Sequence, residues 1–178
     1  MVSKKAVFFD RDGVLNRSII RNKKPFAPRK FDDFHIYKDV KVYVDRLIKN
    51  NFLIFVVTNQ PDIGNGLMKT KELDSMHQKL KSDIEINKIY ICPHSQTAKC
   101  ECRKPSPYFL LQAKEEFRIK IEDSYFVGDR YTDMQASRSV SCKSVFIDRK
   151  YEETPLMDFV YKVKGIKEAV NYILGETK

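Results

Sequence analysis

Residues 5–14 read KAVFFDRDGV, an apolar run that ends in two aspartates and a glycine. The run from Lys5 to Phe9 is typical of a buried strand, and the polar residues mark its carboxyl end. Asp10 and Asp12, two positions apart beside Gly13, offer the hard oxygen ligands that suit Mg²⁺. A carboxylate can also attack phosphorus, while a second one transfers the proton. Alone, this pattern is equally typical of an acidic turn.

Strand-like runs and helical patterns alternate along the rest of the chain. Further strands are predicted at residues 52–57, 89–91, 125–127 and 144–147, with amphipathic helices between them and one around 166–173. This alternation predicts a Rossmann-like three-layer α/β sandwich with a mainly parallel central sheet. We expect one domain over residues 1–178. Because ligands bind at the carboxyl ends of such strands, we expect Asp10, Thr58 and Asp129 to meet there.

A second pattern lies between the third strand and the next helix. The side chains of Cys92, His94, Cys100 and Cys102 offer four N/S ligands for one tetrahedral Zn²⁺. Four protein ligands leave no position for water, so such a zinc is structural. We predict that residues 92–104 form a zinc-binding insert that holds Arg103 and Lys104 rigidly. Ordinary free thiols are the alternative, and the isolated Cys142 is predicted to be a small buried side chain.

Composition limits the classes of function. The chain has 178 residues, 42% of them hydrophobic, and a net charge of +9. No segment is long and apolar enough for a membrane span or a secretory signal, and the clustered cysteines indicate a reducing compartment. The lysines are scattered and no aromatic residues interleave with them, so we expect a small polyanionic substrate and no nucleic acid. We expect a cytoplasmic monomer.

Other polar residues follow the predicted strands. Thr58, Asn59 and Gln60 end the second strand and can hold phosphoryl oxygens, although such residues are commonly turn residues. Lys104 supplies a fixed positive charge for phosphoryl transfer, unless it is a surface lysine. Gly128-Asp129-Arg130, with Asp133 further on, offers another carboxylate for a metal or, alternatively, a turn and helix cap. His35 and His77 have no paired ligand and are predicted to be surface or half-buried side chains.

The order of these pieces resembles the four motifs of the haloacid dehalogenase superfamily. The matching residues are Asp10-x-Asp12-Gly13, Thr58-Asn59-Gln60, Lys104-Pro105 and Gly128-Asp129-x-x-x-Asp133. The cysteine cluster before the third motif resembles the zinc-containing subgroup, which includes heptose bisphosphate and histidinol-phosphate phosphatases. The spacing between motifs leaves no room for a separate cap domain, so we expect a capless fold. Residues 17–34, a long basic loop, and the zinc loop are the expected walls of the site.

The resemblance implies a Mg²⁺-dependent phosphatase that forms an aspartyl-phosphate. It implies Asp10 as nucleophile, Asp12 as acid and base, Thr58 and Lys104 as phosphate ligands, and Asp10, Asp12 and Asp129 around Mg²⁺. Asn59, Gln60, Arg103 and Arg130 are the implied substrate contacts. The segment Asp10 to Asn16 and the basic loop look most like phosphatases that remove the 7-phosphate of D-glycero-D-manno-heptose 1,7-bisphosphate, with the alpha anomer favoured, in surface-polysaccharide precursor synthesis.

Several alternatives stay open. The short interval between Cys92 and Cys100 also resembles histidinol-phosphate phosphatases, and Val14 replaces a threonine that often follows the first motif. The basic loop favours a bisphosphate over an amino alcohol, because a second phosphate needs further cations. A polynucleotide-end phosphatase or nucleic-acid-binding protein is a possibility of another class, which the scattered charge disfavours. An inactive zinc-organised interaction module is disfavoured because every expected catalytic side chain is present.

Overall fold

The structure is a computed structural model that describes residues 4–152 and 161–176. Its centre is a parallel sheet of six strands in the order β5-β4-β1-β6-β7-β8. The strands are β1 (Lys5–Phe9), β4 (Phe52–Asn59), β5 (Lys88–Cys92), β6 (Tyr125–Gly128), β7 (Lys143–Ile147) and β8 (Tyr161–Val163). The predicted parallel α/β fold is confirmed, and β8 is an additional edge strand that the sequence pattern did not predict.

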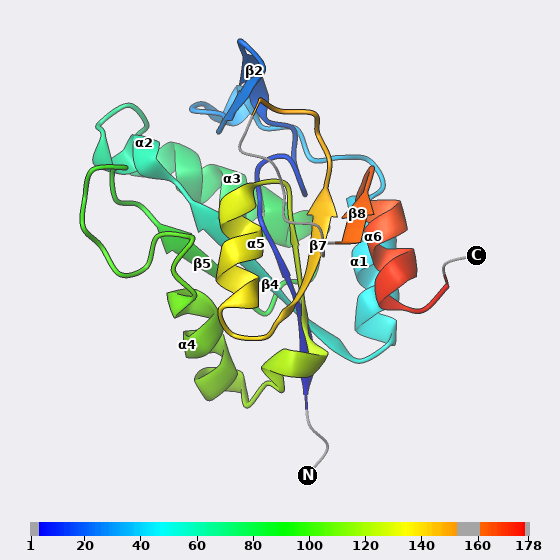
Figure 1. The fold of residues 1–178 in the computed structure, drawn as a ribbon. Coiled ribbons are helices and arrows are strands. Elements are labelled where there is room, and N and C mark those ends of the chain that lie inside the picture. The colour runs from blue at the N-terminus through cyan, green and yellow to red at the C-terminus, as the bar shows by residue number, and fades with distance from the viewer. Residues whose placement is uncertain (1–3, 153–160, 177–178) are drawn as a thin grey trace.

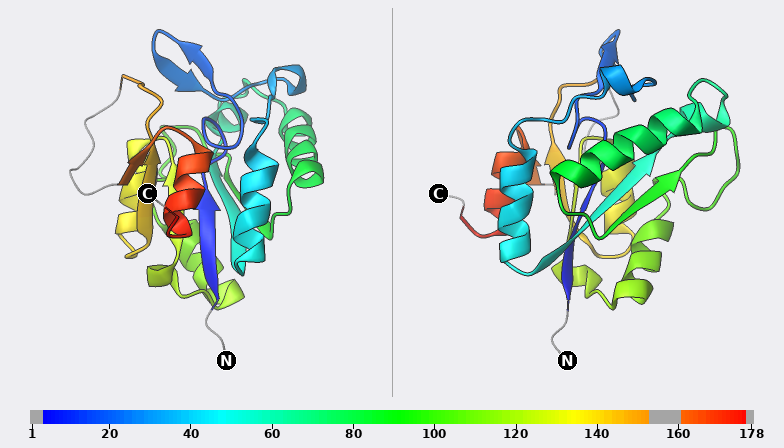
Figure 2. Two further views of the ribbon diagram at one scale, coloured as in Figure 1. Left: turned by 90° about the vertical axis from the view of Figure 1, so that its right-hand side faces the viewer. Right: turned by 180° about the vertical axis from the view of Figure 1, so that it is seen from behind.

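Helices cover both faces of this sheet (Figures 1 and 2). One face carries α1 (Val40–Lys49), α3 (Thr70–Asp83) and α6 (Ile166–Ile173), and α1 and α6 contact each other. The other face carries α4 (Tyr108–Phe117) and α5 (Tyr131–Arg138). Shorter helices occur at α2 (Pro61–Gly64), η1 (Phe31–Asp33) and η2 (Ile121–Asp123). The molecule is therefore a three-layer sandwich.

Strand β1 runs through the middle of the sheet and contributes to both cores. Val7 and Phe9 pack with α1, α3 and α6, whereas Ala6 and Phe8 pack with α4. This division follows from the two-residue period of a strand, which points successive side chains to opposite faces. All four side chains are fully buried, so β1 holds the residue that follows it, Asp10, in a fixed place.

The basic loop is more ordered than the sequence pattern predicted. Residues 19–26 form an antiparallel hairpin of β2 (Ile19–Arg21) and β3 (Lys24–Phe26). Asn22 and Lys23 form its two-residue turn with φ of 48° and 58°, the left-handed geometry that matches the twist of a hairpin. In residues 10–39, only this hairpin and η1 stand between β1 and α1. The hairpin projects beyond the carboxyl end of the sheet (Figure 1).

Within the part of the chain that the structure describes, no helix has both the length and the apolar character needed to cross a bilayer.

Candidate functional site

The carboxyl ends of the central strands bring three aspartates together. Asp10 follows β1 directly, Asp129 follows β6, and Asp133 lies in the first turn of α5. One carboxylate oxygen from each lies within 4.8 Å of the others, and all three residues are buried. The predicted meeting of Asp10 and Asp129 is therefore found, and Asp133 completes a cluster of three.

Gly13 permits the close approach of the first loop to this cluster. Its φ is +87°, in the left-handed region that favours glycine, and a Cβ at this position would lie 1.7 Å from Asp129 Oδ2. The Gly13 amide donates to the Asn16 carbonyl over 2.7 Å, and Arg149 Nε donates to the Gly13 carbonyl over 2.7 Å. The glycine after the two aspartates is thus a steric requirement of the site.

Lys104 is the cation of the buried cluster. Its Nζ donates to Asp10 Oδ1 and to the Val57 carbonyl, each over 2.8 Å, and lies 2.7 Å from Asp133 Oδ1. Asn59 fixes the backbone of this residue, because its side-chain oxygen accepts from the Lys104 amide and its nitrogen donates to the Lys104 carbonyl. The ammonium group is therefore positioned beside the nucleophile predicted from the sequence.

The cluster has more negative than positive charge. When ionised, its three carboxylates face one ammonium, which leaves two negative charges. Burial raises the pKa of Asp10 to about 6, against the opposing effect of Lys104. Burial is the main cause that raises the pKa of Asp129 well above its ordinary value, and the negative charges of Asp10 and Asp133 raise it further. Both effects are what buried carboxylates show without enough counter-charge.

A divalent cation fits this charge and this set of ligands. Tyr151 lies near Asp129, but neither buried Asp129 oxygen has a hydrogen bond of normal geometry within the described residues. Buried polar atoms are normally satisfied, so these oxygens are candidate ligands for a cation. Mg²⁺ prefers carboxylate oxygens, and its charge of +2 would balance the excess. Asp10, Asp129 and Asp133 are the carboxylates that could hold it, and Lys104 pairs with Asp10 and Asp133 but not with Asp129.

Asp12 lies beside the cluster in a dense set of hydrogen bonds. Its oxygens accept from Gln60 Nε2 at 2.7 Å, from Asn16 Nδ2 at 2.9 Å and from the Arg11 guanidinium at 2.9–3.2 Å. Gln60 also donates to Thr58 Oγ1 over 2.8 Å. Roles for Asp12, Thr58 and Gln60 were predicted from the sequence, but none for Arg11 or Asn16. The one indication in the sequence for Arg11 and Asn16 was their position in or beside the first motif.

The Cys/His cluster has the geometry of a tetrahedral metal site. Cys92 Sγ lies 3.6 Å from both His94 Nδ1 and Cys100 Sγ, and Cys102 Sγ lies 3.4 Å from His94 Nδ1. Zn–S bonds of about 2.3 Å and Zn–N bonds of about 2.0 Å give tetrahedral edges of roughly 3.5–3.8 Å. All four ligand atoms lie within 4.8 Å of one another, so they fit one Zn²⁺.

Burial raises the pKa of the Cys92 thiol to about 12, so this thiol is protonated when no metal is bound. Since a zinc ligand must be a thiolate, metal binding at this cluster has to release protons.

A cavity of about 740 Å³ opens above Asp10 and Asp12. One wall is the segment from Lys24 to Arg29, which includes β3, and another contains Gln96 and Arg103 of the zinc loop. The remaining lining residues include Asn59, Lys104, Arg130 and Asp133. Arg103 Nη1 is buried without a hydrogen-bond partner within the described residues. The two segments expected to wall the site do so.

The predicted phosphate and substrate contacts fall into two settings. Asn59, Arg103, Lys104 and Arg130 line the cavity. In contrast, Thr58 and Gln60 are buried and hydrogen-bonded to each other. Gln60 is thus positioned to orient Asp12, and its predicted contact with substrate stays a prediction.

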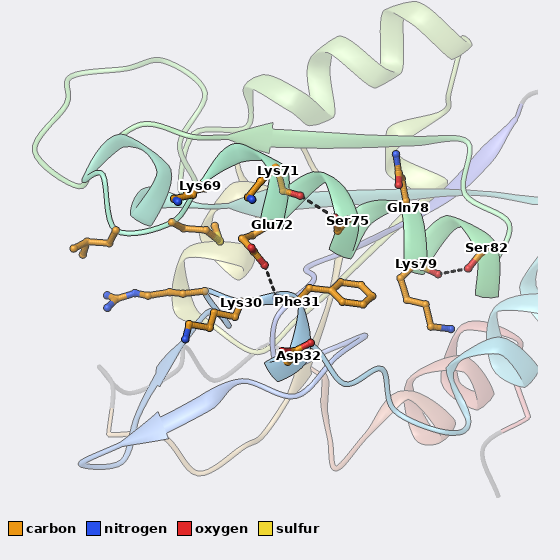
Figure 3. A pocket seen from close by; sticks show the side chains of 13 residues that line it. Lys30, Phe31, Asp32, Lys69, Lys71, Glu72, Ser75, Gln78, Lys79 and Ser82 are labelled. Carbon is orange, nitrogen blue, oxygen red and sulfur yellow. Dashed lines mark hydrogen bonds between the residues drawn. The ribbon is translucent and has the colours of Figure 1, made fainter.

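A second cavity of about 1020 Å³ lies between η1 and α3 (Figure 3). It shares Arg29 and Leu67 with the first cavity, so the two are adjacent. Figure 3 shows Lys30, Lys69 and Lys71 around one end of it, and Phe31 donates its amide to Glu72 over 2.8 Å. The Arg29–Asp62 ion pair, at 2.6 Å, lies at the boundary between the cavities.

Comparison with known proteins agrees with this geometry. The sequence model of the family described as polynucleotide kinase 3 phosphatase matches residues 5–163. The D-glycero-alpha-D-manno-heptose-1,7-bisphosphate 7-phosphatase of Campylobacter jejuni is 36% identical over 173 residues, covering 94% of this chain and 95% of that protein. The corresponding beta-anomer enzyme of Helicobacter pylori strain 26695 is 30% identical over 81% of this chain and 83% of that protein.

A solved structure shares the fold. The D,D-heptose 1,7-bisphosphate phosphatase from B. bronchiseptica, complexed with magnesium and phosphate, superimposes with a TM-score of 0.84. It is 22% identical and covers 97% of this chain and 99% of that one. Together with the sequence matches, these comparisons show that the chain is a phosphoric monoester hydrolase and belongs to the heptose-1,7-bisphosphate 7-phosphatase family of the haloacid dehalogenase superfamily.

Proposed function

We propose that this enzyme hydrolyses the 7-phosphate of D-glycero-D-manno-heptose 1,7-bisphosphate in a Mg²⁺-dependent reaction, with the alpha anomer favoured. The observation that carries the proposal is one cavity with Asp10, Asp12 and Lys104 at its base and further cations, Arg103 and Arg130, in its lining. The name of the Campylobacter jejuni relative supports the alpha anomer. The arrangement suits a substrate with one phosphate to cleave and a second one to hold.

The first step is attack by the nucleophile. A carboxylate oxygen of Asp10 forms a bond to phosphorus while the bond from phosphorus to the sugar oxygen breaks. Asp12 gives a proton to that departing oxygen. Lys104 and the hydroxyl of Thr58 donate to the non-bridging oxygens of the phosphoryl group. The Thr58 hydroxyl hydrogen is available for this bond, because Thr58 Oγ1 accepts from Gln60 and does not donate to it. The product of this step is an aspartyl-phosphate and a free sugar hydroxyl.

The second step restores the enzyme. Water attacks phosphorus, gives its proton to Asp12, and displaces the Asp10 carboxylate, which releases inorganic phosphate. Asp10, Asp129 and the backbone carbonyl of Asp12 hold Mg²⁺ in this proposal. When bound, the ion supplies positive charge next to the transferring phosphoryl group. Asp133 holds Lys104 in place through their 2.7 Å ion pair.

The distal phosphate is assigned to the cavity walls. Arg103 follows directly on Cys102, so a zinc-bound loop holds this arginine with little conformational freedom. Its buried Nη1 lacks a hydrogen-bond partner in the described part of the chain, which supports a role in binding an anion. Arginine suits this role because its planar fork binds phosphate with two hydrogen bonds.

The test is phosphate release in the presence of Mg²⁺ by the wild type and by Asp10→Asn. The substrates are both anomers of heptose 1,7-bisphosphate, histidinol phosphate and a 3′-phosphorylated oligonucleotide. We expect preference for the alpha heptose anomer and no turnover by Asp10→Asn. Asp74→Asn, an exposed position on α3, is the matched control and should keep full activity. Normal turnover by Asp10→Asn would rule out the covalent mechanism, and preference for histidinol phosphate would reassign the substrate.

A polynucleotide-end phosphatase is the second candidate, favoured by the family model and the lysines of the second cavity. Glu72 and Asp32 also line that cavity, which weakens its attraction for a polyanion. Binding of an oligonucleotide through backbone phosphates would weaken steeply with salt. Cleavage of the oligonucleotide in preference to the sugar phosphates, with such a salt dependence, would favour this candidate.

A further inference from the structure

Asp12, the acid and base of the proposed function, is held by its sequence neighbour Arg11. Arg11 Nη2 donates to both Asp12 oxygens over 2.9 Å, and Arg11 Nε lies 3.2 Å from Oδ1. The Arg11 side chain is fully buried, so these contacts exclude solvent. Bidentate contacts of this kind fix the plane of a carboxylate as well as its position. The orientation of Asp12 therefore depends on what fixes the guanidinium.

The far side of the guanidinium contacts α3. Arg11 Nη1 lies 3.1 Å from His77 Nε2 and 4.0 Å from Met76 Sδ, and the Phe34 ring centroid is 5.4 Å from Arg11 Cζ. The prediction that His77 is a surface or half-buried side chain was wrong, since only 7% of it is exposed. A methionine sulfur is a weak acceptor, so His77 provides the strong acceptor for this edge of Arg11.

The hydrogen-bond direction follows from charge. Arg11 carries only donors and stays protonated in proteins. Burial, and then the charge of Arg11, lower the pKa of His77 to about 3. The imidazole is therefore neutral at ordinary pH, and its Nε2 lone pair accepts from Arg11 Nη1.

We propose that His77 is a positioning residue for phosphoryl transfer, which accepts from Arg11 and thereby holds the guanidinium that aims Asp12 at the leaving group. The inference rests on the proposed function, because it gives His77 a role in proton transfer by Asp12. Without this acceptor, a buried charged donor would be left unsatisfied. Arg11 would then turn toward another partner, and Asp12 would lose its orientation.

The test uses the leaving group as a reporter. A sugar phosphate needs a proton on the departing alkoxide, whereas p-nitrophenyl phosphate releases a stable phenolate without one. The ratio kcat/KM reports the steps up to aspartyl-phosphate formation, in which Asp12 protonates the leaving group. If Asp12 loses its orientation, kcat/KM for the sugar phosphate should therefore fall more than kcat/KM for p-nitrophenyl phosphate. We expect His77→Leu to lower kcat/KM for heptose 1,7-bisphosphate by about 10-fold or more, with the 10²–10⁴-fold that a general acid contributes as the upper bound. The loss for p-nitrophenyl phosphate should be much smaller.

Two comparisons separate positioning from packing. His77→Gln, whose oxygen can replace Nε2 as acceptor, should restore most of the activity, whereas the shorter His77→Asn should not. This polar pair also serves if His77→Leu fails to fold. Gln78→Leu, an exposed change at the next position of α3, is the control and should match the wild type on both substrates.

Each outcome is decisive. Equal losses on the two substrates, or equal activity of His77→Gln and His77→Asn, would overturn the positioning role while the wild-type activity leaves the proposed function intact. A wild type that cleaves neither substrate would overturn the proposed function, and this inference with it.

Discussion

Replacement of Lys104 by methionine tests the charge balance of the site. The lysine side chain is only 3% exposed, and its Nζ contacts Asp10 Oδ1, Asp133 Oδ1 and the Val57 carbonyl at 2.7–2.8 Å. Burial opposes its charge, but the two carboxylates outweigh burial and raise the pKa of Lys104. Methionine has a similar length and no charge, so Lys104→Met removes the counter-ion and leaves three buried acceptors without this donor.

The expected loss of stability is large. Removing one partner of a buried ion pair typically costs about 3–5 kcal/mol, because the remaining charge is buried without compensation. For a chain of 178 residues, this loss corresponds to a fall in Tm of roughly 10 °C. Phosphatase activity should disappear as well, since Lys104 is a proposed phosphate ligand.

The loss should depend on pH with a definite sign. The pKa of Asp10, about 6 in the folded protein, already exceeds its ordinary value of 3.8, and Lys104 is the main effect that lowers it. Without Lys104 this pKa rises further. A carboxyl whose pKa is raised by folding destabilises the protein above that pKa, and protonation relieves the cost as pH falls. The variant should therefore lose more stability at pH 8 than at pH 5.

Urea unfolding in Mg²⁺-free buffer without a chelator, at both pH values, measures this effect. Addition of Mg²⁺ at pH 8 should recover part of the lost stability, because the ion supplies positive charge to the same carboxylates. Lys99→Met, an exposed position in the zinc loop, is the matched control and should unfold like the wild type. If Lys104→Met loses no more stability than this control, or loses the same amount at both pH values, the electrostatic account of the cluster is wrong.

Three further predictions concern the metals and the cavity wall. Mg²⁺ should raise the Tm of the wild type more at pH 8 than at pH 5.5, because Asp10 and Asp129 must lose protons to bind it; equal shifts in thermal unfolding would contradict this. Elemental analysis should find about one zinc per chain. Cys102→Ser should lose both the zinc and thermal stability, whereas Cys142→Ser should keep the zinc. Arg103→Ala should raise KM for the bisphosphate roughly 10- to 100-fold with a smaller change in kcat, because it removes a charge-assisted hydrogen bond of about 1.5–3 kcal/mol. An unchanged KM in steady-state assays would show that Arg103 does not contact the substrate.

The aspartate cluster could be predicted because it depends on strand ends. Apolar runs locate β1, β4 and β6, and the ends of parallel strands meet at one edge of a sheet. Asp10, Thr58 and Asp129 could therefore be brought together from local patterns alone. The Cys/His cluster was also predictable, because its four side chains lie within residues 92–102 and need little tertiary information.

Features that depend on packing between distant segments could not be predicted in this way. The hairpin turn at Asn22-Lys23 adopts left-handed geometry without the Asn-Gly pair that signals such turns. The short edge strand β8 has only three residues. The burial of His77 arises because α3 packs over Arg11, a contact 66 residues apart in the sequence. No local pattern at His77 distinguishes this environment from a surface position.

The proposed reacting groups and the cavity walls come from different parts of the fold. The reacting groups stand on buried strands, whereas the cavity walls belong to the β2–β3 hairpin and the zinc loop. Relatives that are 36% and 30% identical to this chain carry names for opposite anomers. An anomer differs in the direction of its phosphate at C1, the end of the sugar away from the cleaved bond. Because the walls and not the strand ends face that end in the proposed orientation, changes in the hairpin and the zinc loop should alter the choice of anomer while leaving the hydrolytic chemistry of Asp10 intact.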